Sequence, residues 1–108
     1  MCIRDRQRIY TATVGHMPEI LRLYVDEGWP RLEAGGYTDK LVGYFTSDTG
    51  ALHQLIHLWR FDDDADRRDF WARLFADDEF MKFAVQLRPH LDSQTVQLLN
   101  SAPWGPRP

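Results

Sequence analysis

Histidines beside aromatic residues make the segment 52–61 the part of the sequence best suited to chemistry. If this segment is a strand, its side chains alternate between two faces, and His53 and His57 share one face with Leu55 and Trp59. A histidine in an aromatic-lined cavity can act as a general base or bind a metal or haem iron. His57 is therefore the candidate catalytic residue, and His53, close to the expected turn, is the weaker candidate.

A metal centre is not predicted from these histidines. A structural zinc site usually gathers about four ligands and a catalytic site about three plus water. No third His, Cys or carboxylate is spaced locally to complete either set. The alternative role for His57 is that of a hydrogen-bonded residue in the core or at an interface.

Aromatic residues elsewhere could surround an apolar ligand between helices and sheet, because binding pockets are mainly hydrophobic with few polar groups. Aromatic residues make up 13% of the chain, with four Trp, which is more area than the core of so small a domain readily hides. At helical and strand spacing the same side chains could instead be core. This predicted ligand set comprises Tyr10, Tyr44, His57, Trp59, Trp71, Phe75 and Met81.

The composition describes one ordinary globular domain. The chain has 108 residues, 44% of them hydrophobic, and no apolar run approaches the roughly 20 residues of a membrane-spanning helix. The net charge is −3, and neither sign forms a stripe. Electrostatic capture of nucleic acid or of an anionic membrane surface is therefore disfavoured.

The first six residues stand apart from the rest. Met1 to Arg6 resembles the translation of a transposase adaptor used in sequencing libraries, so residues 1–6 are predicted to be a non-native artefact. Cys2, the single cysteine, lies in that stretch, and one cysteine excludes an internal disulfide. With no signal-peptide pattern, the expected location is the cytoplasm.

Periodicity and turn signals predict the order strand, helix, strand, strand, helix, strand. Pro18 and Glu19 suit a first helical turn, and aspartates at 62–64 and 77–78 suit helix N-termini. Residues 101–108 carry three prolines and form a predicted tail, in which Trp104 could pack as an anchor. The predicted strands are 8–14, 41–46, 52–61 and 91–99, with helices over 17–27, after 62–64, and from 77 to the residue before Pro89.

The third predicted strand is apolar on both faces. Ile56 and Leu58 lie on the face opposite His57, so both faces should be covered. Helices in so short a chain can cover only one, and the simplest cover for the other is an identical subunit. The sequence thus predicts residues 7–100 to be an α+β, ferredoxin-like βαββαβ domain that forms a homodimer through its four-stranded antiparallel sheet.

The sequence also resembles the NIPSNAP family. The resemblance rests on Gly43 to Thr46, on Gly50, on His57-Leu58-Trp59 and on Phe61-Asp62, and it extends over nearly all of residues 7–100. It implies a dimeric α+β barrel, in which two four-stranded sheets pack face to face, and a family whose biochemical activity is poorly defined. One departure is the absence of the usual acidic residue before the first Tyr-Thr strand.

Three kinds of function fit these observations. The first is a homodimeric interaction scaffold, and the second is a module that binds a small apolar or aromatic ligand. The third is a cofactor-independent monooxygenase or haem-handling enzyme, which the wider barrel group suggests by analogy of fold. No catalytic set supports an enzyme, no cofactor is predicted apart from the haem alternative, and a cavity holding His57 would separate the last two from the first.

Overall fold

The computed structural model describes residues 4–100 and 102–104, so the predicted artefact and tail are covered only in part. The first strand, β1, extends back to Arg4, and the predicted boundary at residue 6 does not coincide with an end of the strand. In order, the elements are β1 (Arg4–Ala12), α1 (Met17–Leu23), η1 (Tyr24–Gly28), α2 (Trp29–Ala34), η2 (Tyr37–Lys40), β2 (Leu41–Thr46), β3 (Gln54–Phe61), α3 (Asp64–Ala76), α4 (Asp78–Leu87), η3 (Arg88–His90) and β4 (Leu91–Asn100).

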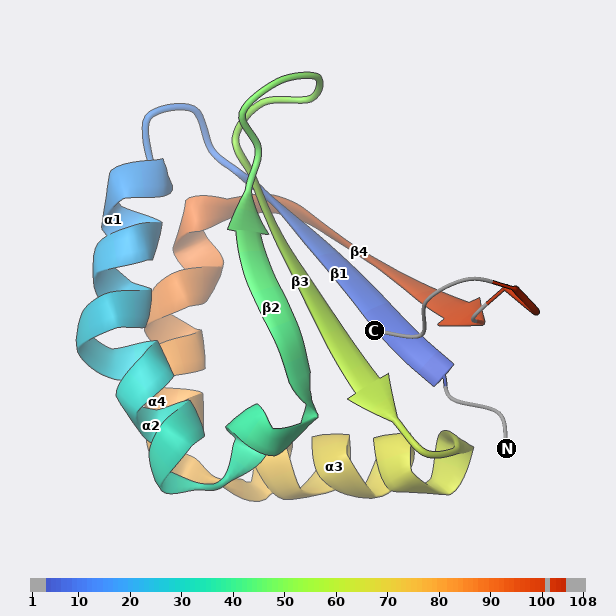
Figure 1. The fold of residues 1–108 in the computed structure, drawn as a ribbon. Helices are drawn as coiled ribbons and strands as arrows, with labels where there is room; N and C mark the ends of the chain where they lie inside the picture. The colour runs from blue at the N-terminus through green and yellow to red at the C-terminus, as the bar shows by residue number, and fades with distance from the viewer. Residues whose placement is uncertain (1–3, 101, 105–108) are drawn as a thin grey trace.

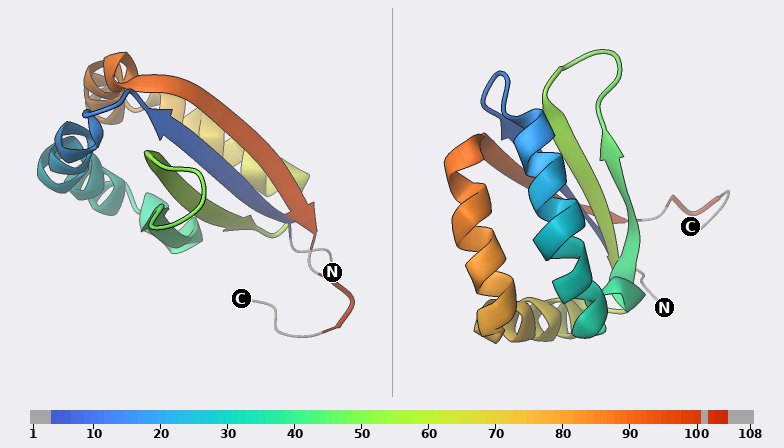
Figure 2. Two further views of the ribbon diagram at one scale, coloured as in Figure 1. Left: turned by 90° about the horizontal axis from the view of Figure 1, so that it is seen from above. Right: turned by 90° about the vertical axis from the view of Figure 1, so that its left-hand side faces the viewer.

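The strands form one antiparallel sheet in the order β2-β3-β1-β4. All the helices stand on one side of this sheet, with α3 running across one end of it and α4 beside α1 and α2 (Figures 1 and 2). The predicted βαββαβ order and the ferredoxin-like α+β fold are confirmed.

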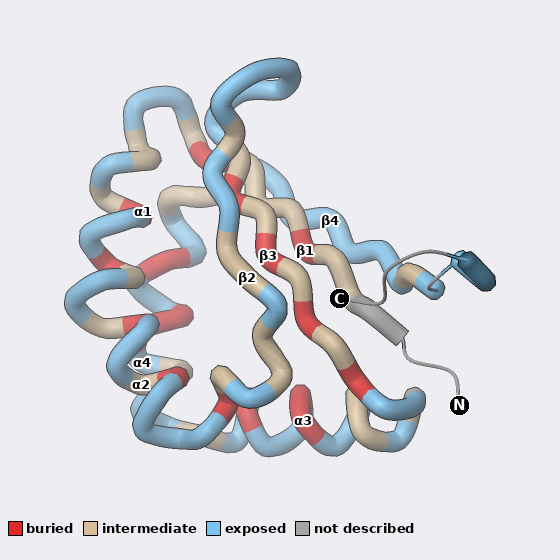
Figure 3. Tube along the Cα trace, in the orientation of Figure 1, coloured by how far each residue is buried: buried red, intermediate tan, exposed pale blue. Residues whose placement is uncertain are grey.

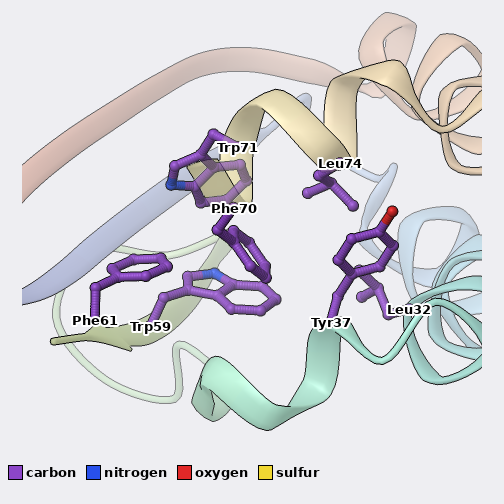
Figure 4. Close-up of a cluster of buried hydrophobic side chains, with 7 residues drawn as sticks. All are labelled: Leu32, Tyr37, Trp59, Phe61, Phe70, Trp71 and Leu74. Atoms are coloured by element: carbon purple, nitrogen blue, oxygen red, sulfur yellow. The ribbon is translucent and has the colours of Figure 1, made fainter. Parts of the chain in front are cut away.

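The core lies between the helices and the central strands. Leu55, His57, Trp59 and Phe61 are buried on the helix-facing side of β3, and the residues between them are only partly covered, as the predicted alternation requires. Figure 4 shows one buried cluster, in which α3 meets β3 and the segment before β2. Its members are Leu32, Tyr37, Trp59, Phe61, Phe70, Trp71 and Leu74.

The helical segment from Met17 to Ala34 continues past the predicted end at Glu27. A π-helical turn, η1, joins α1 to α2, and the Trp29 amide donates to the carbonyl of Tyr24. Pro30 is tolerated because it occupies the first turn of α2. Gly28 is needed for close packing, since a Cβ there would lie 2.6 Å from Cζ of Phe83.

Aspartates begin the last two α-helices, as predicted. The Asp63 side chain accepts a hydrogen bond from the Asp66 amide at 2.8 Å. Asp77 accepts from the amides of Glu79 and Phe80 in the same way. Each carboxylate satisfies amides that have no partner within the first helical turn.

Some sequence expectations were wrong in detail. The first strand ends at Ala12, and Val14 is exposed in the following turn. On α4, Val85 is exposed, whereas Phe83 is buried. Trp104 is 76% exposed, so it does not anchor the tail. Within the described residues, no helix combines the length and apolar character that crossing a membrane requires.

Within the described residues, no segment covers the side of the sheet that faces away from the helices (Figure 2). Paired positions on β2, β3 and β1 place Phe45, Ile56 and Ile9 next to one another on this open face. Phe45 is half exposed, and the two isoleucines are only partly buried. Figure 3 shows that β4 is exposed along nearly its whole length.

Candidate functional site

His57 occupies the centre of a row of side chains that crosses the helix-facing side of the sheet. Its paired residue on β2 is Tyr44, its paired residue on β1 is Arg8, and Arg8 is paired in turn with Val96 on β4. Because directly paired residues of antiparallel strands point to the same face, all four side chains share the helix-facing side. We call this set the His57 row.

Hydrogen bonding fixes the state of His57. The Trp59 indole N–H donates to Nδ1 of His57 over 2.6 Å. Indole can only donate, so Nδ1 is the accepting nitrogen and the proton of the neutral ring is on Nε2. Burial, together with the nearby charges of Arg8 and Arg6, lowers the pKa of His57 from 6.5 to about 3. The ring is therefore neutral at physiological pH, and its buried Nε2–H has no hydrogen-bond partner in the described part of the chain.

Aromatic rings enclose His57. The Tyr44 ring stacks on it with centroids 4.7 Å apart, and the Tyr10 ring meets it edge-on at 4.8 Å. Only 2% of the residue surface is exposed. His57 thus contributes a neutral hydrogen-bond donor inside an aromatic cluster, and in this tautomer it offers no free lone pair for a proton or a metal.

The structure brings most of the predicted ligand set together through ring contacts. Tyr10, Tyr44 and Trp59 contact His57, Trp71 contacts Trp59, and Phe75 stacks on Trp71 at 5.8 Å. Met81 lies apart on α4, partly buried. Because these rings pack directly against each other, the space between helices and sheet is filled by side chains.

An open groove of about 680 Å³ lies beside this cluster, between the first helical segment and strand β2. Tyr44 belongs both to the groove lining and to the His57 row, so its ring separates the groove from His57. Tyr24 packs on Tyr44 at 5.3 Å, and burial raises the pKa of both hydroxyls. The lining residues are mostly apolar: Leu21, Tyr24, Val25, Trp29, Leu41, Val42, Gly43, Tyr44, Phe45, Thr46 and Leu55.

Sequence reasoning missed most of this groove. Its helical wall includes Val25 and Trp29, which are apolar residues left exposed outside the buried stripe of the helix. They are four positions apart, which is helical spacing, and this was the available signal. What the sequence could not show is that β2 would lie opposite them.

The two histidines of the third predicted strand do not share a face. His53 precedes β3, is exposed, and has a φ of 62°. A non-glycine residue with positive φ belongs to a turn, which ends the alternation assumed for 52–61. His53 therefore takes no part in the His57 row.

A different histidine pair, missed from the sequence, joins the start of α1 to the start of β4. His16 and His90 lie with their Nδ1 atoms 2.9 Å apart, so one ring donates and the other accepts. Thr13 donates to Asp92 nearby at 2.8 Å. In the part of the chain that the structure describes, no three His, Cys, Asp or Glu side chains gather as metal ligands would.

Comparisons with known proteins agree on the family. The NIPSNAP family profile matches residues 6–106. A NIPSNAP family protein from Agrobacterium tumefaciens superposes with a TM-score of 0.88 at 28% identity, covering 95% of this chain and 89% of its own. An uncharacterized NIPSNAP domain protein from Burkholderia xenovorans gives 0.83 at 32% identity, covering 96% and 99%.

A more distant similarity concerns the fold alone. An antibiotic biosynthesis monooxygenase superposes with a TM-score of 0.63 at 15% identity, over 93% of this chain and 99% of its own. A comparison with curated proteins finds no match. Since the family profile spans almost the whole sequence and similar structures share its fold at up to 32% identity, this chain belongs to the NIPSNAP family.

Proposed function

We propose that this NIPSNAP domain is a homodimeric module that binds a small apolar or aromatic molecule in the groove beside β2. The observation that carries the proposal is the groove itself. Its volume of about 680 Å³ falls in the range of about 300–1,000 Å³ that small-molecule sites occupy. Its walls are mainly apolar, and the lining residues that carry a polar group are few, among them Tyr24, Tyr44 and Thr46.

The backbone of the groove supports a binding role. Tyr24 and Val25 project from the π-helical turn η1, and such turns are frequent at functional sites. Trp29, at the start of α2, and Val42, on β2, leave more than a third of their surfaces exposed. A flat aromatic or branched apolar ligand that covered them would remove this surface from water.

The homodimer is supported by the open face of the sheet. Ile9, Ile56, Leu58 and Phe45 place apolar side chains on that face, which no described segment of the chain covers. A second copy packed sheet to sheet would bury the same surface on both subunits. The groove opens beside β2 at the edge of the sheet, and Phe45 is a residue that the groove and the open face share.

An enzymatic function has less support. A monooxygenase that works without a cofactor would need a base, and haem binding would need an imidazole nitrogen with a free lone pair. Trp59 occupies Nδ1 of His57, and Nε2 carries the proton. The similarity to a monooxygenase extends to the fold and supports no step of chemistry.

Ligand binding can be tested with N-phenyl-1-naphthylamine, a neutral aromatic dye whose fluorescence rises in apolar sites. We expect the native protein to bind it and Val25→Asp to weaken binding at least about tenfold, because the carboxylate would lose hydration against the dye. Val85→Asp is the matched control, since Val85 is also exposed on a helix but lies outside the groove. Equal weakening by both variants, or no binding by the native protein, would contradict the proposal.

The subunit count can be tested separately by sedimentation and native mass spectrometry. We expect a dimer that Leu58→Lys converts to a monomer, because an ammonium group on the open face would meet its own copy across the interface. Leu52→Lys, in an exposed turn, should leave the dimer unchanged. A native protein that stays monomeric at high concentration would refute the proposed homodimer.

A further inference from the structure

Arg8 is a buried cation that finds no anionic partner among the described residues. It is 9% exposed, on the helix-facing side of β1, and in the part of the chain that the structure describes its Nε has no hydrogen-bond acceptor. Its guanidinium carbon lies 4.7 Å from the Trp71 ring centroid and 5.4 Å from that of Tyr10. Among the described residues, no carboxylate forms an ion pair with it.

This arrangement leaves the charge of Arg8 poorly compensated. A buried charge is normally paired and hydrogen-bonded, because leaving water is costly for an ion. Aromatic faces attract a guanidinium but do not accept hydrogen bonds as a carboxylate does. An anion is the kind of group that would satisfy both the charge and the hydrogen-bond donors of Arg8.

The surrounding charges strengthen this conclusion. Arg6 stacks on the same Trp71 ring at 4.6 Å, and its Nε finds no acceptor among the described residues. Burial, together with the nearby charges of Arg8 and Arg67, lowers the pKa of Arg6 to about 10. The nearest charge partner of Arg67 is Asp64, whose carboxylate pairs with Arg67 at 2.6 Å and with Arg68 at 2.7 Å.

Apolar side chains border the two arginines. Val96 and Leu98 on β4 are paired with Arg8 and Arg6, and they are 46% and 47% exposed. On α3, Phe75 is half exposed and stacks on Trp71. A cationic centre with an uncovered apolar border matches an amphipathic anion.

We propose that Arg8, assisted by Arg6, binds the carboxylate of a small organic acid whose apolar body lies over Val96 and Leu98. This site is at the β1–β4 end of the His57 row, and the groove of the proposed function is at the β2 end. The two sites are therefore independent. Arg8 holds the primary contact because it is buried, whereas Arg6 is only partly buried.

The residue at position 6 determines whether the site is open. A carboxylate there would lie on the same face of β1 as Arg8, two residues away, and could pair with it. Arg6→Glu should thus close the site with an internal anion, while Arg6→Ala should leave Arg8 free.

Calorimetric titration with octanoate, and with 1-octanol as the neutral analogue, tests the proposal. We expect octanoate to bind at least about tenfold more tightly than octanol. Arg8→Met should remove this preference, and Arg8→Lys should retain part of it. Arg6→Ala should weaken octanoate binding a few-fold, and Arg6→Glu should abolish octanoate binding. Arg68→Ala is the control, because Arg68 is exposed and already paired with Asp64.

Several results would overturn the proposal. Equal binding of octanoate and octanol would leave an apolar surface and no anion site. Undiminished octanoate binding by Arg8→Met or by Arg6→Glu, each with a native circular dichroism spectrum, would show that Arg8 is not the contact. Displacement of the naphthylamine dye by octanoate, or loss of octanoate binding in Val25→Asp, would place the acid in the groove. Failure of the dye to bind would count only against the groove.

Discussion

The two halves of the helix-facing side of the sheet differ in whether their polar groups have partners. On the β2–β3 half, Tyr44, His57 and Trp59 are neutral, interlocked by ring contacts and joined by a short hydrogen bond. On the β1–β4 half, Arg6 and Arg8 are charged and have no ion-pair partner among the described residues, and they lie beside exposed Val96 and Leu98. The same sheet thus carries a packed core on one half and polar groups without hydrogen-bond partners on the other. A bound molecule would stabilise the second half most, because it could supply those partners.

The largest expected effect comes from removing the centre of the packed half. Trp59→Ala should destabilise the fold by about 3–5 kcal/mol, because it leaves a cavity and removes the partner of His57. Leu98→Ala on the β1–β4 half should cost less than about 1 kcal/mol, since that side chain is half exposed. Urea unfolding measures the free energy of unfolding of both variants. Similar losses in the two variants would show that the two halves contribute equally to stability.

The next effect concerns pH. His57 has a pKa of about 3 when folded and about 6.5 when unfolded, so between these values the unfolded chain binds the extra proton. Stability should fall by about 1.4 kcal/mol for each pH unit as pH decreases below 6.5, and this loss should extend toward pH 3. Between pH 6.5 and 5, the stability of His57→Gln should change less with pH than the stability of the native protein. An identical slope in both proteins would show that His57 is not held neutral.

A gain in stability is expected on the other half. Arg8→Met keeps an unbranched side chain over Trp71 but removes a buried charge, so without ligand it should stabilise the fold by about 1–2 kcal/mol. Thermal unfolding at low and high salt measures the gain. A destabilised variant would mean that the aromatic contacts of Arg8 already compensate its charge.

The smallest effect is expected at Phe75, the outer member of the predicted ligand set. Phe75→Ala should cost less than about 1 kcal/mol, because half of the side chain is exposed and only its stacking on Trp71 is lost. Urea unfolding measures the free energy of unfolding of Phe75→Ala and of Trp71→Ala for comparison. A loss as large as that of Trp71→Ala would extend the packed core to the edge of α3.

The sequence was sufficient for the fold because the local signals agreed with one another. Alternation over β3 and the aspartates at 63 and 77 each specify one element without help from distant residues. His53 and the turn at Tyr24–Gly28 were misjudged because a positive φ and a π-helical turn leave no clear periodic signal.

The candidate sites were harder to predict. The partners of His57 and Arg8 lie on other strands, so they depend on strand register, and an unpaired cation can be recognised only when all its neighbours are known. The groove likewise requires Val25 and Val42 to face each other across a helix and a strand. These are properties of tertiary packing, which periodicity in one segment does not encode.

The hydrogen bond between Trp59 and His57 also makes it possible to measure how often the domain opens. Its indole proton is shielded from solvent by the helix layer, so deuterium can replace it only when that layer lifts from the sheet. The exchange rate of this single proton, followed by NMR, would therefore report how often the domain opens.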